Sequence, residues 1–151
     1  MKMLTDPVLV ALALAAGALL PLQALVNARL GVQLAAPVWA ATVQNVLGAL
    51  AMGLVVLAVR EPAPSAAQFA AAPVWTWAGG LLGATYVLIA LLATPKLGAT
   101  RAMVAIITGQ LAASVLFDQF GVLQARRDID LKTVGGLVLL AGGAWLILRR
   151  S

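Results

Sequence analysis

The side chains that could do chemistry inside the apolar segments of this chain are neutral amides, hydroxyls and one phenol. The deepest are Gln23, Gln44, Asn45, Tyr86 and Gln110, and one helical turn away on the same faces lie Asn27 and Ser114. Such groups exchange hydrogen bonds with a ligand without burying a charge. We therefore predict that this set lines a substrate-binding cavity. The alternative is that the amides only hydrogen-bond neighbouring helices.

One carboxylate continues this pattern. Gln110, Ser114 and Asp118 follow each other at intervals of one turn, so they form a single polar stripe along a helix. Asp118 is close enough to the end of its segment to reach water. We predict a role in gating or ion coupling at the cavity mouth. A purely structural role, capping the helix end or pairing with Arg126 or Arg127, is the alternative.

Motifs for enzymatic chemistry are missing from the sequence. It contains no HExxH, no Gly-x-Ser-x-Gly, no CxxC and no phosphate-binding glycine loop before a lysine. It also has neither cysteine nor histidine, which removes thiolate chemistry and the most common metal ligands. We expect no catalytic residue, no metal site and no cofactor, so the chain is predicted not to be an enzyme.

The segments that carry the polar groups are too apolar for a water-soluble domain. Of 151 residues, 63% are apolar and 10% charged, and the mean hydropathy is +1.03. Long runs without alternating polarity favour helices, and about 20 residues of helix cross a hydrocarbon core of about 30 Å. The first run is expected to be a retained helix rather than a signal peptide. The sequence predicts one all-α membrane domain, residues 1–151, with five spans: 7–30, 37–59, 73–93, 97–117 and 131–148.

The basic residues divide evenly between the two sides of the membrane. Threading the chain through the five spans places five on the N-terminal side: Lys2, Arg60, Arg126, Arg127 and Lys132. The other side receives Arg29, Lys96, Arg101, Arg149 and Arg150. Orientation normally follows an excess of Lys and Arg in cytoplasmic loops. We therefore predict insertion in both orientations and an antiparallel homodimer, which rebuilds the inverted repeat of many transporters. Because these cations lie in loops and at helix ends, no nucleic-acid partner is expected.

Proline, aspartate and glycine predict how the spans end and pack. Pro21 predicts a break in the first span, and the segment 95–98 predicts a tight turn between the third and fourth. Asp128 or Asp130 is placed to cap the fifth. Small residues let helices approach closely in lipid, so we predict that the dimer packs through glycine faces. The glycines concerned are Gly79, Gly83, Gly135, Gly136, Gly142 and Gly143.

Three stretches resemble the YdcZ-type family of the drug/metabolite transporter superfamily. They are GALLPLQALVNARLG at 17–31, Gly109-Gln110 followed by Asp118-Gln-Phe-Gly121, and Trp77-Ala-Gly79-Gly80 ahead of Tyr86. The likeness runs over essentially the whole chain, and its first stretch is the most specific. It implies a five-helix half of a ten-helix transporter in a bacterial inner membrane, which exports a small metabolite or drug-like molecule.

The resemblance has one clear departure and leaves two alternatives. The four-helix multidrug members of that superfamily exchange protons for cations through a glutamate in their first helix, and the first span here has no acidic residue. The same five-helix chain could also be a non-transporting membrane interaction subunit. It could equally be a half-transporter that requires a paired homologue.

Overall fold

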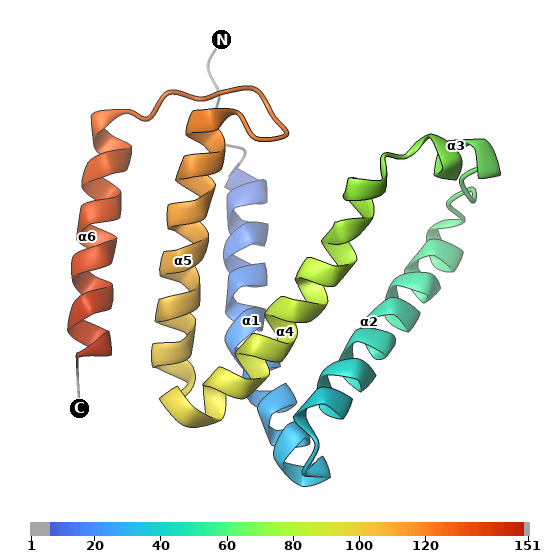
Figure 1. Ribbon diagram of the computed structural model, residues 1–151, viewed down its shortest axis with the longest axis horizontal. Coiled ribbons are helices and arrows are strands. Elements are labelled where there is room, and N and C mark those ends of the chain that lie inside the picture. Colours follow the sequence, from blue (N-terminus) through green and yellow to red (C-terminus); the bar gives the residue numbers. More distant parts are fainter. Residues whose placement is uncertain (1–6, 150–151) are drawn as a thin grey trace. The chain divides into compact units, whose positions relative to one another are not determined.

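The computed structural model describes residues 7–149, and this range is helical apart from its connections. The helices in chain order are α1 (Pro7–Leu34), α2 (Pro37–Val59), α3 (Ala66–Ala71), the 3-10 helix η1 (Val74–Trp77), α4 (Ala78–Leu97), α5 (Ala99–Phe120) and α6 (Leu131–Leu148) (Figure 1). No strand occurs within the described range. Five segments are long and apolar enough to cross a membrane, with η1 and α4 forming one of them. The predicted five-helix, all-α membrane fold is confirmed.

The helix bounds agree closely with the predicted spans. α2 and α6 coincide with the second and fifth predicted spans. α1 continues beyond the predicted end of the first span to Leu34, and α5 continues to Phe120. Inside the loop expected at 60–72, the short helix α3 begins at Ser65, whose side chain and that of Gln68 form a capping box. Hydropathy therefore located the spans, and local capping set their ends.

The two proline predictions need correction. α1 is a single helix with Pro21 inside it, so the expected break is absent. In lipid, a break would expose several backbone groups, whereas an internal proline removes only one hydrogen bond. Pro95 likewise lies inside α4, and the connection to α5 is Gly98 alone. Gly98 has φ 79° and ψ 153°, a conformation open essentially only to glycine.

The chain divides into two compact units, residues 1–96 and 97–151. The single domain expected from the sequence stays a prediction. In the first unit, α1 and α2 are antiparallel neighbours, as their short connection predicted. A small core joins α2 to α4 and consists of Ala40, Ala41, Val87 and Leu91. α1 approaches α4 at Gly31, where an added Cβ would lie 3.1 Å from Leu91 Cδ2.

The second unit is a pair of packed helices, α5 and α6, joined by residues 121–130. Gly121, with φ 64°, ends α5 by donating its N–H to the Asp118 carbonyl at 3.3 Å. Of the two candidate caps, Asp130 begins α6, because its carboxylate accepts from the Thr133 N–H at 2.8 Å. Asp128 instead pairs with Arg126 at 3.5 Å.

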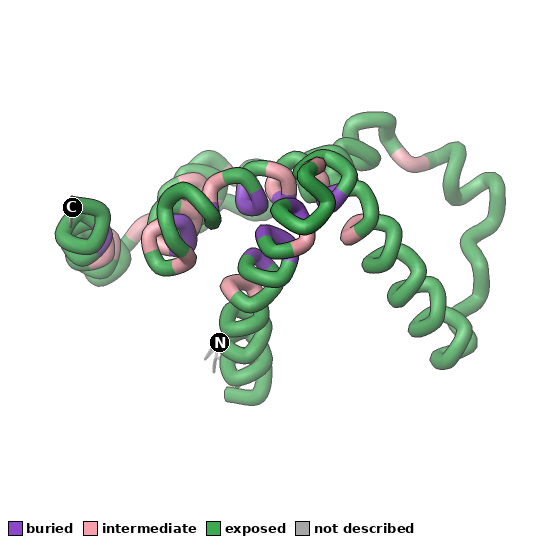
Figure 2. Tube along the Cα trace, turned by 90° about the horizontal axis from the view of Figure 1, so that it is seen from below, coloured by how far each residue is buried: buried purple, intermediate pink, exposed green. Residues whose placement is uncertain are grey.

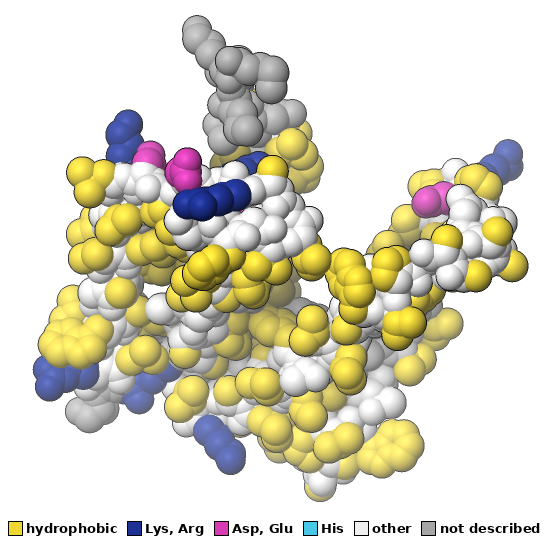
Figure 3. Space-filling model, turned by 45° about the horizontal axis from the view of Figure 1, so that its top comes forward, with side chains coloured by type: hydrophobic (Ala, Val, Ile, Leu, Met, Phe, Trp, Pro, Cys, Tyr) yellow, Lys and Arg dark blue, Asp and Glu magenta, His cyan; other side chains and the backbone are white. Residues whose placement is uncertain are grey.

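The membrane-crossing helices bury little of their surface within one chain. Figure 2 shows exposed residues along most of the described trace. In each of the five spans, 11% or less of the most apolar window is buried. In Figure 3, hydrophobic side chains cover the helices, and the coloured charged side chains lie toward helix ends and connections. Most of the apolar surface is thus available to lipid or to another protein chain.

Candidate substrate-binding site

The first polar region lies between α1 and α4. Gln23 and Asn27, one turn apart on α1, line the same small space as Tyr86 of α4. Small neighbours such as Ala24 and Ala90 allow the two helices to come together there. The space measures about 10 Å³, which is at most enough for a single water molecule. The structure therefore brings three predicted site residues together around one small space.

Two amides in the first unit have hydrogen-bonding capacity that this unit does not use. Asn27 is 7% exposed, and its side chain makes no hydrogen bond to any of the described residues. The buried Oε1 of Gln44 on α2 also has no partner within the described range. A buried polar atom left without a partner costs about 1–3 kcal/mol. Among the described residues, Gln44 Oε1 is therefore the polar atom that most needs a partner.

A larger cleft separates α2 from α4. Its volume is about 500 Å³, and its polar lining consists of Thr42, Asn45 and Thr85. Asn45 Nδ2 donates to the Ala41 carbonyl of its own helix at 2.7 Å, which leaves its carbonyl oxygen available to a ligand. The volume falls in the range of small-molecule sites. Of the predicted set, only Asn45 lines this cleft.

Thr42 and Thr85 were not among the predicted site residues. Each hydroxyl donates to the carbonyl four residues earlier, at 2.9 Å to Val38 and 2.8 Å to Leu81. A threonine in a membrane helix satisfies itself in this way, so its presence alone says little about a cavity. Their spacing in the sequence could have identified them, since Thr42 precedes Asn45 by about one turn and Thr85 adjoins Tyr86.

The predicted residues of the second unit lie outside its interior. Gln110 and Ser114 are exposed on α5. The space between α5 and α6, about 380 Å³, is lined instead by Thr108 and apolar residues such as Ile107 and Leu139. The Thr108 hydroxyl donates to the Val104 carbonyl at 2.7 Å. None of the described residues of this unit hydrogen-bonds the Gln110 side chain.

Asp118 holds the connection after α5. Its carboxylate accepts a hydrogen bond from Gln124 Nε2, and its backbone carbonyl accepts from the Arg127 N–H at 2.9 Å. Neither expected side-chain ion pair of Asp118 is present, because Arg126 pairs with Asp128 and Arg127 contributes only its backbone N–H. Asp118 thus organises the loop through its carboxylate and its backbone carbonyl. The gating role and the structural alternative both stay predictions.

Charge is nearly absent from these polar regions. None of the side chains lining the α1–α4 contact or the α2–α4 cleft is Asp, Glu, Lys or Arg. The described residues contain no group of three potential metal ligands. A carboxylate with a perturbed pKa lies elsewhere: hydrogen bonds from the Thr133 side chain and backbone lower the pKa of Asp130 at the start of α6. The chemistry offered at these sites is neutral hydrogen bonding.

A bundle of membrane-crossing helices with neutral polar groups around small cavities is typical of small-molecule transport proteins. A family model supports this class: residues 8–146 match the family described as putative inner membrane exporter, YdcZ. The chain belongs to this family and is a multi-pass inner-membrane protein of the exporter type. The comparison with curated proteins found no match, and neither did the comparison with solved structures.

Proposed function

We propose that the chain is a half-transporter that works as a dual-topology, antiparallel homodimer and exports a small metabolite or drug-like molecule. The observation that carries this proposal is the balance of basic residues. Threading the chain through the observed helices assigns four of them to the N-terminal side of the membrane: Arg60, Arg126 and Arg127 in connections, and Lys132 in the first turn of α6. The other side receives Arg29, Lys96, Arg101 and Arg149. Lys2 and Arg150, one for each side, lie outside the described residues.

An exposed amide and two open glycine faces support the need for a second copy. Gln110 is exposed on α5, and an unpaired amide facing lipid is costly. Gly83 on α4 and Gly142 on α6 have no atom within 4 Å of an added Cβ, so neither is used for packing within the chain. An antiparallel partner could cover both features, with ten membrane-crossing helices arranged as an inverted pair.

The proposed substrate ligands are neutral polar groups. Asn27 and Gln44 would supply their unused hydrogen-bonding atoms, and the α2–α4 cleft would supply Asn45 and room for a ligand. Gln23, Tyr86, Gln110 and Ser114 complete the proposed set. Ligand binding would separate α1 from α4 at their contact. The side chains that line the water-sized space would then contact the ligand. Asp118 would act at the mouth of this path.

The hydrogen bonds weigh against the interaction-subunit alternative. If the amides only joined helices, their side chains should bond across α1, α2 and α4. Instead, the side-chain bonds of Thr42, Asn45 and Thr94 return to their own helices, and none described in this unit joins two membrane-crossing helices. Polar groups that do not join helices remain available for a ligand.

Reporter fusions test the orientation. A C-terminal reporter active only in the cytoplasm and one active only in the periplasm should both give signal with the native chain. Two lysines added to the connection 60–72 should silence one of them, because they create a charge bias. Signal from a single reporter in the unmodified chain would exclude dual topology and favour the paired-homologue alternative.

A ligand screen tests transport separately. Purified dimer should show a thermal shift with a small molecule, and the Asn27→Ala and Asn45→Ala variants should reduce it. A matched control is Thr42→Val, because the Thr42 hydroxyl already bonds its own helix. If every screened compound leaves the protein unshifted while proteoliposomes also show no flux, the interaction-subunit alternative is the better account.

A further inference from the structure

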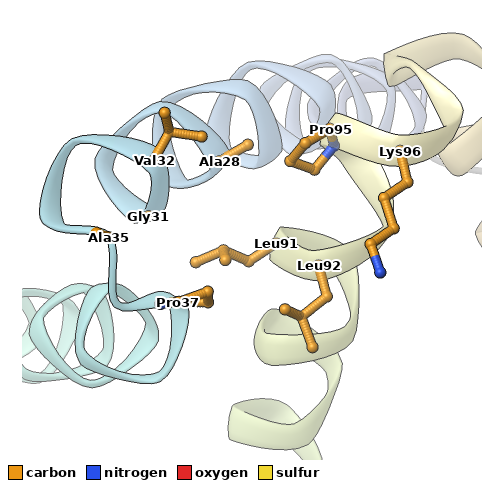
Figure 4. Close-up of a pocket in the computed structure, with 9 residues that line it drawn as sticks. All are labelled: Ala28, Gly31, Val32, Ala35, Pro37, Leu91, Leu92, Pro95 and Lys96. Atoms are coloured by element: carbon orange, nitrogen blue, oxygen red, sulfur yellow. The ribbon is translucent and has the colours of Figure 1, made fainter.

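A further cavity lies at the ends of three helices in the first unit, and it shares only Leu91 with the α1–α4 space. Figure 4 shows it between the last turns of α1 and of α4, beside the first residue of α2. Its volume is about 310 Å³. Ala28 and Gly31 of α1 and Ala35 just after it form one wall, and Leu91 points across from α4. The lining is apolar except for one side chain, Lys96.

The groove follows from the small residues of α1. At Gly31 the missing side chain lets Leu91 come so close that even a Cβ would be tight. On either side of this contact, Ala28 and Ala35 are too small to fill the space between the helices. Pro37 at the start of α2 and Pro95 near the end of α4 add rigid apolar rings to the wall. The result is an apolar slot within the groove, and it opens at the helix ends.

The charges at this end of the unit are all positive. Lys96 lies in the last turn of α4, and Arg29 is exposed near the end of α1. Glu61 is the sole acidic residue in 7–96, and it follows α2, whereas the groove lies at the start of α2. Among the described residues, no carboxylate is close enough to pair with Lys96. An unpaired ammonium therefore stands at the rim of an apolar groove.

We propose that this groove binds an anionic phospholipid, with part of an acyl chain in the slot and the phosphate against Lys96. Connections between membrane-crossing helices lie at the level of the lipid headgroups. A basic side chain there attracts anionic lipid by about 1 kcal/mol. One turn of a helix, about 10 Å across and about 5.4 Å long, occupies about 420 Å³, which is more than the 310 Å³ of the slot. It also lacks the hydrogen-bonding side chains with which a polar substrate would be held.

Native mass spectrometry of the full chain tests this site. Protein in nanodiscs or mixed micelles would be offered phosphatidylglycerol or phosphatidylethanolamine at equal concentration. We expect retained phosphatidylglycerol to predominate. Lys96→Gln should weaken that binding about fivefold, whereas Lys96→Arg should keep it. The matched control, Lys132→Gln, removes a lysine near the start of α6 and should leave binding unchanged.

Two further measurements separate the groove from simple charge attraction. Ala28→Phe fills the slot and should reduce retention of both lipids, while Lys96 remains in place. An unchanged far-UV spectrum and melting temperature would show that this variant folds. Glycerol 1-phosphate, which has no acyl chain, should not compete. Equal losses for Lys96→Gln and Lys132→Gln, full binding by Ala28→Phe, or competition by glycerol 1-phosphate would each overturn the proposal.

Discussion

The two units of this chain differ in how far they bury their polar side chains. In the first, Asn27 and Thr94 are buried, at 7% and 3% exposure. In the second, Gln110 and Ser114 are exposed on α5. Three long helices contacting one another can enclose a polar side chain, whereas the buried residues of the second unit, Ala102, Met103 and Ala144, are all apolar. The comparison teaches that the first unit can build a polar cavity by itself, and that the second offers polar groups to something outside it.

The largest effect should come from the contact that holds the first unit together. Gly31→Leu places a bulky side chain against Leu91 and Pro37, so α1 and α4 must separate. We expect a loss of about 1–3 kcal/mol in the free energy of unfolding, measured in mixed micelles by denaturant titration. Gly17→Leu on the same helix meets open space and is the control. Similar losses for both variants would contradict a special role of this contact.

The open glycine faces, one in each unit, should depend on a partner chain. Gly142→Leu on α6 and Gly83→Leu on α4 add side chains to faces that are open within one chain. If these faces form the dimer, its dissociation constant should rise at least about fivefold, or about 1 kcal/mol. Analytical ultracentrifugation in detergent measures this. A dimer unaffected by either change moves the interface to another face, with α1 and α5 the next candidates.

Variants of Gln110 and Asp118 should separate ligand binding from ion coupling. Gln110→Ala should weaken ligand binding about two- to tenfold at every pH, because one neutral hydrogen bond is lost. Asp118→Asn should keep binding and, if Asp118 couples transport to protons, abolish the pH dependence of flux in proteoliposomes. If instead wild-type pH dependence persists, Asp118 serves only the loop that it joins through Gln124.

The smallest effect should concern the start of α6. Asp130 has a pKa below its ordinary value because Thr133 donates hydrogen bonds to its charged form. The charged carboxylate therefore stabilises the folded helix above the unfolded pKa of about 3.9, and this contribution disappears as pH falls through the lower, folded value. Asp130→Asn should keep the cap but remove that acid-dependent step, and Asp130→Ala should lose both. Amide hydrogen exchange in the first turn of α6, followed from neutral to acidic pH, reports both changes.

Much of the architecture was predictable because it depends on short stretches of chain. Hydropathy and length located the five spans, and α2 and α6 match them residue for residue. Asp130 at the start of α6 followed from a capping rule that involves only its neighbours in sequence. The predicted break at Pro21 was wrong, because α1 continues through it. A proline rule derived in water underestimates how strongly lipid favours an unbroken helix.

The sequence by itself determined the number, length and chemical character of the helices, and the neutrality of the polar groups within them. Only the tertiary structure decided which of those groups meet: Asn27 with Tyr86 across α1 and α4, Asn45 with two threonines in a cleft, and Gln110 with none in its unit. The reason is physical. These helices are apolar on all sides, so the periodicity that marks the buried face of a soluble helix is missing. How each helix turns about its axis then depends on close contacts such as Gly31 against Leu91, which link residues far apart in the chain.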